Sequence, residues 1–256
     1  MNLSKTFRTR VLAGERLGGT FLNLGSPVTV EMAGCAGFDW LLLDHEHGPG
    51  GEETMLHQLQ AAAATPAVPI VRIAANEPPR FKRVLDLGAG GVMVPWVNTA
   101  AEARQAVGSL RYPPRGIRGV AKLNRACDFG ASFGDYYAHA HEWLVTMAQI
   151  ETPDGVKNAA EIAAVDGVDV LFIGPMDLTT SMGIQEQFDH PDYRAAVKQV
   201  TTAARNAGKA TGILVLNPAL LPICEEFGIT VVALGSDGGH ANAGLRQSAA
   251  LVKKKG

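Results

Sequence analysis

The chain has 256 residues, with 23 lysines and arginines against 25 aspartates and glutamates, and 46% of its residues are hydrophobic. This apolar content can form a buried core, so an intrinsically disordered chain is excluded. The formal net charge of −2 excludes a protein that gathers nucleic acid through a bulk positive field. The length fits two small domains or one (β/α)8 barrel, which needs about 250 residues.

Targeting and cysteine signals are weak throughout the chain. The amino-terminal stretch lacks the apolar run of a signal peptide, and no window approaches the roughly 18 apolar residues that span a bilayer. Cys35, Cys127 and Cys224 are widely spaced and form no CxxC pair, which argues against a disulfide framework or a cysteine-built zinc site. We therefore expect a cytoplasmic protein with neither a membrane nor a nucleic-acid partner.

Eight apolar runs of strand length alternate with alanine-rich stretches. The predicted strands are residues 19–24, 39–43, 69–73, 91–94, 144–150, 169–173, 211–216 and 230–234. The predicted helices are residues 3–14, 54–64, 79–87, 100–110, 158–164, 192–207, 219–227 and 241–254. The strand runs are continuously apolar, which is typical of strands buried on both faces of a parallel sheet.

Eight strand–helix alternations over this length predict an α/β fold, a (β/α)8 TIM barrel that occupies residues 1–256 as a single domain. An open, doubly wound sheet is the alternative, but no GxGxxG motif follows the first strand. Residues 111–141 form an unusually long connection, which we predict to be a functional or partly ordered loop.

Acidic residues follow two neighbouring strands at the face where barrel enzymes place their active sites. Glu151 follows the fifth apolar run and Asp177 the sixth. Two carboxylates completed by waters form an oxygen-rich site that suits Mg²⁺ or Mn²⁺. The alternative is that both residues cap helices, with Asp177 as an N-cap.

Basic residues stand near the same face. Arg72 lies inside an apolar strand and needs an anion, either an acidic side chain or an oxygen of a small acid substrate. The segment Asp44-His45-Glu46-His47 follows the second strand. It lacks a third zinc ligand, so an acid–base pair of imidazole and carboxylate fits it better, and a turn of capping residues is the alternative. No lysine stands at a strand's carboxyl end, which argues against Schiff-base chemistry.

These segments together resemble the HpcH/HpaI aldolase family. The matching blocks, in order between about residues 18 and 239, are Asp44-x-Glu46-His47, PIVRI with Arg72, LDLGAGGVMVPWV, YPPRGIRGV, QIET with Glu151, and GVDVLFIGPMDL with Asp177. The family consists of metal-dependent (class II) pyruvate aldolases, including those for 4-hydroxy-2-oxoheptanedioate, 2-dehydro-3-deoxyglucarate and 2-keto-3-deoxyrhamnonate. The resemblance implies a barrel of the phosphoenolpyruvate/pyruvate-binding type.

The resemblance implies a role for each matching residue. Glu151 and Asp177 would bind a divalent cation (Mg²⁺, Mn²⁺ or Co²⁺), with no organic cofactor. Arg72 would bind the carbonyl oxygen of pyruvate or hydroxypyruvate and steady the enolate. His47 would be the catalytic histidine and Asp44 its acidic partner. His45 stands where a small or apolar residue is common.

Further roles follow from the same resemblance. Gln149 would lie near pyruvate, Gly174 and Pro175 would form a turn whose backbone amide holds the pyruvate carboxylate, and Leu214 would line the aldehyde side. Asp86 would reach the neighbouring subunit's site. The assembly would be a homo-hexamer, a trimer of dimers, with the C-terminal helix exchanged between subunits.

The partners expected of such an enzyme are a 2-oxo acid and an aldehyde. Two alternatives stay open at this point. One is an acyl-CoA lyase of the citrate or malyl type, or a phosphoenolpyruvate mutase-like enzyme, on a similar barrel; the D-x-E-H motif argues against it. The other is a non-catalytic barrel that binds a small acid.

Overall fold

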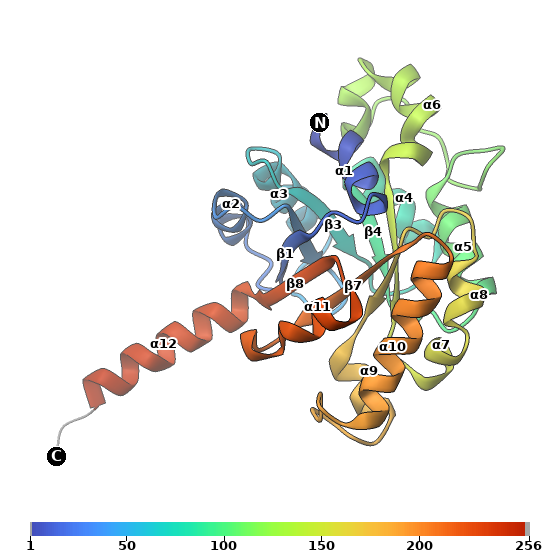
Figure 1. Ribbon diagram of the computed structural model, residues 1–256. Helices are drawn as coiled ribbons and strands as arrows, with labels where there is room; N and C mark the ends of the chain where they lie inside the picture. The colour runs from blue at the N-terminus through green and yellow to red at the C-terminus, as the bar shows by residue number, and fades with distance from the viewer. Residues whose placement is uncertain (1, 254–256) are drawn as a thin grey trace.

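A closed barrel of eight parallel strands forms the centre of the computed structural model, which describes residues 2–253 (Figure 1). Each strand pairs with the next along the chain, and the eighth pairs with the first. The strands are β1 (Leu17–Leu22), β2 (Trp40–Asp44), β3 (Val68–Arg72), β4 (Gly91–Val94), β5 (Val145–Ile150), β6 (Val170–Ile173), β7 (Ala210–Val215) and β8 (Val231–Ser236).

Helices precede, connect and follow the strands. They are α1 (Asn2–Leu12), α2 (Pro27–Cys35), α3 (Glu52–Ala62), α4 (Pro78–Asp86), α5 (Ala100–Leu110), α6 (Phe133–Trp143), α7 (Pro153–Lys157), α8 (Ala159–Ala163), α9 (Pro175–Ser181), α10 (Pro191–Asn206), α11 (Pro222–Phe227) and α12 (Asp237–Lys253). Two 3-10 turns, η1 (Arg125–Gly130) and η2 (Pro218–Leu220), complete the elements.

The predicted barrel is confirmed, and the open-sheet alternative is wrong. Every predicted strand matches an observed one to within two residues at each end. The predicted closing helix extends to Lys254, which lies outside the described residues. The predicted long loop of residues 111–141 is only partly irregular, because it contains η1 and most of α6. The helix α2 was not predicted, since its β-branched residues do not favour a helix.

The continuous apolar runs have a simple cause in the packing. Alternate residues of each strand face two different cores: Trp40 and Leu42 pack inside the barrel, whereas Leu41 and Leu43 pack against the surrounding helices. Both faces of the sheet are therefore buried. Polar side chains are forced toward the strand ends, where the candidate site lies.

The helix that follows β8 departs from the usual barrel arrangement. Figure 1 shows α12 projecting away from the barrel to the C-terminus, and the helix has no buried residue. Its apolar residues Leu245, Leu251 and Val252 are more than two-thirds exposed. Within residues 2–253, no helix combines the length and apolar character needed to cross a membrane.

Candidate active site

A buried ion pair joins the ends of β2 and β3. The strand register sets Asp44 directly beside Arg72. The guanidinium donates two hydrogen bonds to the carboxylate, from Nε to Oδ1 at 3.0 Å and from Nη2 to Oδ2 at 2.7 Å. Burial alone would raise the pKa of Asp44, but the hydrogen bonds and charge of Arg72 outweigh it and hold the pKa below its usual value. Arg72 therefore has the acidic partner that its burial required.

The segment after β2 adds a second acid to this pair. Glu46 places Oε2 at 3.0 Å from Nη1 of Arg72 and at 3.7 Å from Nε2 of His47. The Oδ1 atom of Asp44 instead accepts the backbone N–H groups of Glu46 and His47, at 3.1 and 3.3 Å. The expected contact between the Asp44 carboxylate and the His47 ring is thus not formed, because Arg72 and the backbone occupy that carboxylate. Glu46 is the carboxylate beside the ring, a role that the sequence did not predict.

His47 and His45 have different surroundings within this segment. The His47 side chain is 68% exposed, so a ligand at the barrel mouth can reach its ring. The His45 ring is mostly buried, with Nε2 at 2.9 Å from Oε1 of Gln58 on α3. Burial lowers the pKa of His45 despite this hydrogen bond. His45 therefore attaches the segment to α3.

Glu151 is the most deeply buried acid at the carboxyl ends of the strands, with 1% of its surface exposed. Its Oε1 accepts the backbone N–H of Trp96 at 2.8 Å, and its Oε2 accepts a hydrogen bond from Nε2 of Gln149. Burial raises the pKa of Glu151 to about 7, and the negative charges of Asp177 and Glu46 add to that effect. The Oε1 atom of Gln149 is buried without a partner.

Asp177 stands in the first turn of α9, half-buried and close enough to Glu151 to repel it electrostatically. The N-cap of α9 is Gly174, so the alternative assignment of Asp177 as an N-cap is wrong. Among residues 2–253 no group of three or more His, Cys, Asp or Glu side chains is arranged to hold a metal ion. A cation at Glu151 and Asp177 would need oxygens from water or substrate as further ligands.

The donor set nevertheless fits a hard divalent cation. Glu46, Glu151 and Asp177 repel one another, and the charge of Arg72 offsets part of the repulsion on Glu46 and Glu151. Burial, with this repulsion added, raises the pKa of Glu151 to about 7. Carboxylate oxygens are the ligands that Mg²⁺ and Mn²⁺ prefer. A divalent cation between Glu151 and Asp177 would relieve the repulsion.

The turn after β6 packs directly against these acids. A Cβ atom on Gly174 would lie 2.5 Å from Oε2 of Glu151, so only glycine fits there. The Gly174 N–H donates to the Ile150 carbonyl at 3.2 Å, so any amide that this turn offers to a ligand lies after Pro175. Leu214 on β7 packs against the core inside the barrel, on the side of the sheet that leads to the mouth.

Asp86 lies at the other end of the barrel. It ends α4, shortly before β4 begins, and its Oδ1 accepts a hydrogen bond from Nη2 of Arg118 at 2.7 Å. Arg118 is fully buried against Tyr112 and Tyr136. Asp86 therefore does not meet the other candidate residues within this chain, and its predicted contact with a neighbouring subunit stays a prediction.

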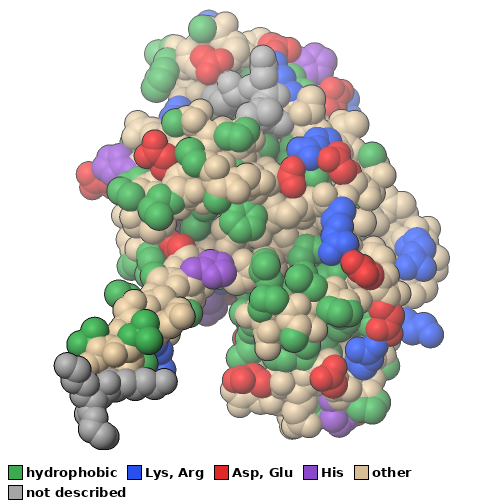
Figure 2. Space-filling model, turned by 60° about the vertical axis from the view of Figure 1, so that its left-hand side comes forward, with side chains coloured by type: hydrophobic (Ala, Val, Ile, Leu, Met, Phe, Trp, Pro, Cys, Tyr) green, Lys and Arg blue, Asp and Glu red, His purple; other side chains and the backbone are tan. Residues whose placement is uncertain are grey.

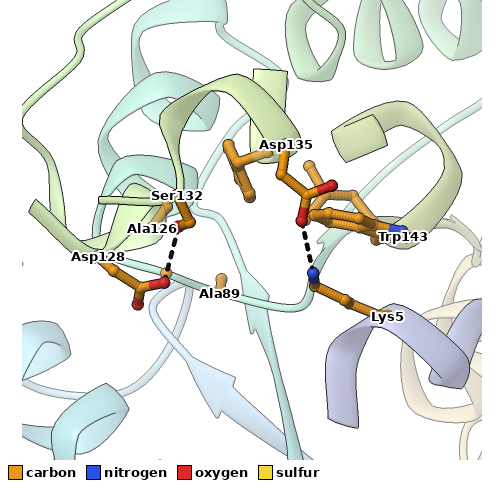
Figure 3. A pocket seen from close by; sticks show the side chains of 10 residues that line it. Lys5, Ala89, Ala126, Asp128, Ser132, Asp135 and Trp143 are labelled. Carbon is orange, nitrogen blue, oxygen red and sulfur yellow. Dashed lines mark hydrogen bonds and ion pairs between the residues drawn. The ribbon is translucent and has the colours of Figure 1, made fainter. Parts of the chain in front are cut away.

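A separate cavity also lies far from the candidate site. Its walls come from α1, η1, α6 and the residues before β4 and β5, at the amino ends of the strands (Figure 3). Lys5 enters it, but Nζ is 2.7 Å from Oδ2 of Asp135 and packs over the Trp143 ring at 4.1 Å. This lysine is thus an ion-paired residue at the opposite end from the strand-end acids.

The fold and the acidic residues at the strand ends are those of a barrel enzyme that acts on small acids. Comparison with known proteins identifies its family. Residues 17–243 match the family model described as HpcH/HpaI aldolase/citrate lyase. The chain belongs to this family, whose aldolases are carbon–carbon lyases.

Named relatives agree with this assignment. The chain is 41% identical to the 5-keto-4-deoxy-D-glucarate aldolase of Salmonella arizonae, over 97% of this chain and 96% of the relative. It is 41% identical to the 4-hydroxy-2-oxo-heptane-1,7-dioate aldolase of Shigella sonnei, over 92% and 90% of the two chains. A solved structure of a family protein from Burkholderia cenocepacia superimposes with a TM-score of 0.92 at 36% identity, over 98% and 100% of the two chains. The acyl-CoA lyase, mutase and non-catalytic alternatives are not favoured.

Proposed function

We propose that this chain catalyses reversible aldol addition and cleavage between a 2-oxo acid, such as pyruvate or hydroxypyruvate, and an aldehyde, with a divalent metal ion as its cofactor. The observation that carries the proposal is the repelling Glu151–Asp177 pair, which lies with the buried Arg72 at the carboxyl ends of the strands. Mg²⁺, Mn²⁺ and Co²⁺ all suit these donors. The product of addition would be a 4-hydroxy-2-oxo acid.

A divalent cation held by Glu151 and Asp177 supplies Lewis-acid polarisation of the oxygens of the 2-oxo acid. Arg72 would donate hydrogen bonds to the same oxygens from a fixed position, because Asp44 and Glu46 hold its guanidinium in one orientation. When the methyl group of the acid loses a proton, negative charge develops on the carbonyl oxygen. A preoriented guanidinium stabilises that charge without first having to reorganise.

The proton needs a base at the mouth of the barrel, and His47 has the exposure for that role. Glu46 lies next to the ring, with Oε2 at 3.7 Å from Nε2, and can orient it. Asp44 has an indirect role, because it holds Arg72 and the backbone of the Glu46–His47 segment in place. Gln149 would orient Glu151, and its partnerless Oε1 is available to a ligand.

The proposal is tested by the exchange of pyruvate methyl protons for deuterium, followed by NMR. We expect exchange with Mg²⁺ or Mn²⁺ and none with EDTA. Replacing Glu151 or Asp177 with alanine should reduce exchange at least 100-fold, and Arg72→Ala by a similar factor, since one lost charge-stabilising donor costs about 10²–10³ in rate. Irreversible inactivation by borohydride with pyruvate would show lysine chemistry instead and would overturn the proposal.

The proposed assembly is a homo-hexamer, a trimer of dimers, in which α12 is exchanged between subunits. In a (β/α)8 barrel the helix after the last strand belongs to the outer ring. Here α12 leaves its own barrel, while Val28 and Met32 of α2 are about two-thirds exposed. Figure 2 shows apolar side chains at the far end of α12 and on the nearby barrel surface. A second copy would cover both surfaces.

We also propose a cytoplasmic location. Cys35, Cys127 and Cys224 are all free thiols in the structure, and Cys35 is exposed. Exposed thiols are typical of proteins kept in reducing compartments.

A further inference from the structure

Trp96 belongs to a turn that is fixed against the candidate metal ligands. The turn follows β4, and two hydrogen bonds attach it to the end of β5. The Trp96 N–H donates to Oε1 of Glu151 at 2.8 Å, and the Val97 N–H donates to the Gln149 carbonyl at 3.1 Å. The indole therefore begins at a backbone that touches Glu151 directly.

The backbone of Trp96 is left-handed, with φ at 53°. A bulky residue rarely adopts this conformation, in which glycine would be unstrained. Non-glycine residues held this way are concentrated at functional sites, where the surrounding structure maintains the strain. Trp96 is also 47% exposed, so the presence of an indole at this position is not explained by burial in the core.

The charges around this turn disfavour a second acidic group on a substrate. Asp44, Glu46, Glu151 and Asp177 gather at the mouth, and Arg72 already binds two of them. A divalent cation would leave a net negative charge, and the carboxylate of the 2-oxo acid would add to it. The described loops that follow β1 to β7 contain no lysine or arginine.

Apolar side chains stand at the same face. Leu24, two residues after β1, and Leu216, directly after β7, are about 45% exposed, like Trp96. Leu214 lies partly buried just inside the barrel. An apolar chain on the aldehyde would be removed from water against such surfaces, which is favourable. A second carboxylate would find no lysine or arginine in these loops to pair with.

We propose that the acceptor aldehyde carries an uncharged, apolar chain and that the Trp96 indole is the surface that selects it. This inference rests on the proposed aldolase function. The proposed substrate differs from those of the named relatives. Their substrates, a glucarate derivative and a heptane-1,7-dioate, carry two carboxylates.

The experiment compares two acceptors of equal length, butanal and 4-oxobutanoate, with pyruvate and Mg²⁺. We expect wild-type kcat/KM to be at least about tenfold higher for butanal. The variant is Trp96→Gly, because glycine accepts a φ of 53° and keeps the N–H that Glu151 needs. It should lower kcat/KM for butanal about tenfold and leave that for 4-oxobutanoate within about twofold.

Two measurements separate the indole from the metal site. Deuterium exchange into pyruvate and Mg²⁺ affinity by calorimetry should stay near wild type in Trp96→Gly, and Trp96→Phe should keep the preference for butanal. The matched control is Phe129→Gly, which removes another exposed aromatic side chain with φ at 53°, in η1. Phe129→Gly should leave kcat/KM unchanged for both acceptors.

A wild-type preference for 4-oxobutanoate would overturn the inference while leaving the aldolase function standing. An equal loss for both acceptors in Trp96→Gly, accompanied by a loss of deuterium exchange, would also overturn it and would show a role in holding Glu151. Absence of exchange in the wild type would overturn the aldolase function, and this inference with it.

Discussion

Burial raises the pKa of Glu151 well above that of an ordinary glutamate, and this shift links metal binding to pH. In the folded chain its pKa is about 7, against 4.5 for an ordinary glutamate. Between these values the folded state holds a proton that the unfolded chain has released. The metal-free protein therefore loses stability as pH rises from 4.5 to about 7.

A metal ion must displace this proton, so its affinity should weaken about tenfold for each pH unit below 7. The check is the rise in melting temperature with Mg²⁺, measured at about pH 5.5 and about pH 8. We expect a much larger rise at the higher pH, and little rise at either pH in Glu151→Gln. An equal rise at both pH values in the wild type would contradict the assignment of Glu151 as a ligand.

At this scale the sequence predicts which side chains meet and fails to predict how they pair. Asp44, Arg72 and His47 do gather at one end of the barrel, because parallel strands end on the same face. The pairing depends on the irregular backbone after β2, which directs Glu46 to the His47 ring and Asp44 to Arg72. The left-handed Trp96 has no sequence signal either, since tryptophan does not favour that conformation.

Among the elements, α9 and β5 come together at Gly174, and a side chain there would displace Glu151. The Cβ of Gly174→Ala would lie 2.5 Å from Oε2 of Glu151 and 2.9 Å from Nε2 of Gln149. We expect a loss of about 1–3 kcal/mol in the free energy of unfolding from overpacking. Because the carboxylate must move, Mg²⁺ affinity should also fall at least tenfold.

The control is Gly108→Ala in α5, where nothing outside the helix's own neighbouring backbone lies within 4 Å of the added methyl group. Alanine favours a helix over glycine by up to about 1 kcal/mol, so this variant should be slightly stabilised. Calorimetry and urea unfolding measure both variants. Unchanged Mg²⁺ affinity in Gly174→Ala would mean that Glu151 tolerates the displacement and would argue against its proposed role.

Element prediction succeeded where a single physical cause dominates. Strands that are buried on both faces have continuous apolar sequences, so all eight strands were predicted. The helix α2 was missed because its stability comes from elsewhere: Ser26 caps it, Pro27 begins it, and Gly34 packs closely against Thr65. Tertiary packing of that kind overrides the weak helix preference of its β-branched residues.

At the scale of the whole molecule, the position of α12 indicates whether one subunit can bury its own apolar surface. The helix contacts only β1 and β8 appreciably, at its base, and leaves its apolar residues in water. Exposed leucines on one projecting helix are unfavourable unless they pack elsewhere, since burying a leucine side chain contributes about 1.5–3 kcal/mol. Exchange between subunits would bury them.

The proposed exchange predicts that charge on the apolar residues of α12 will break the assembly. Leu245→Glu combined with Leu251→Glu should give monomers or small oligomers by light scattering, because the two carboxylates could not be buried in a partner's surface without counter-ions. Gln247→Glu adds a charge to the same helix without removing an apolar side chain, and it should leave the hexamer intact. If the double variant kept the mass of the wild type, α12 would not be the connecting element, and the surface of Val28 and Met32 would need another occupant.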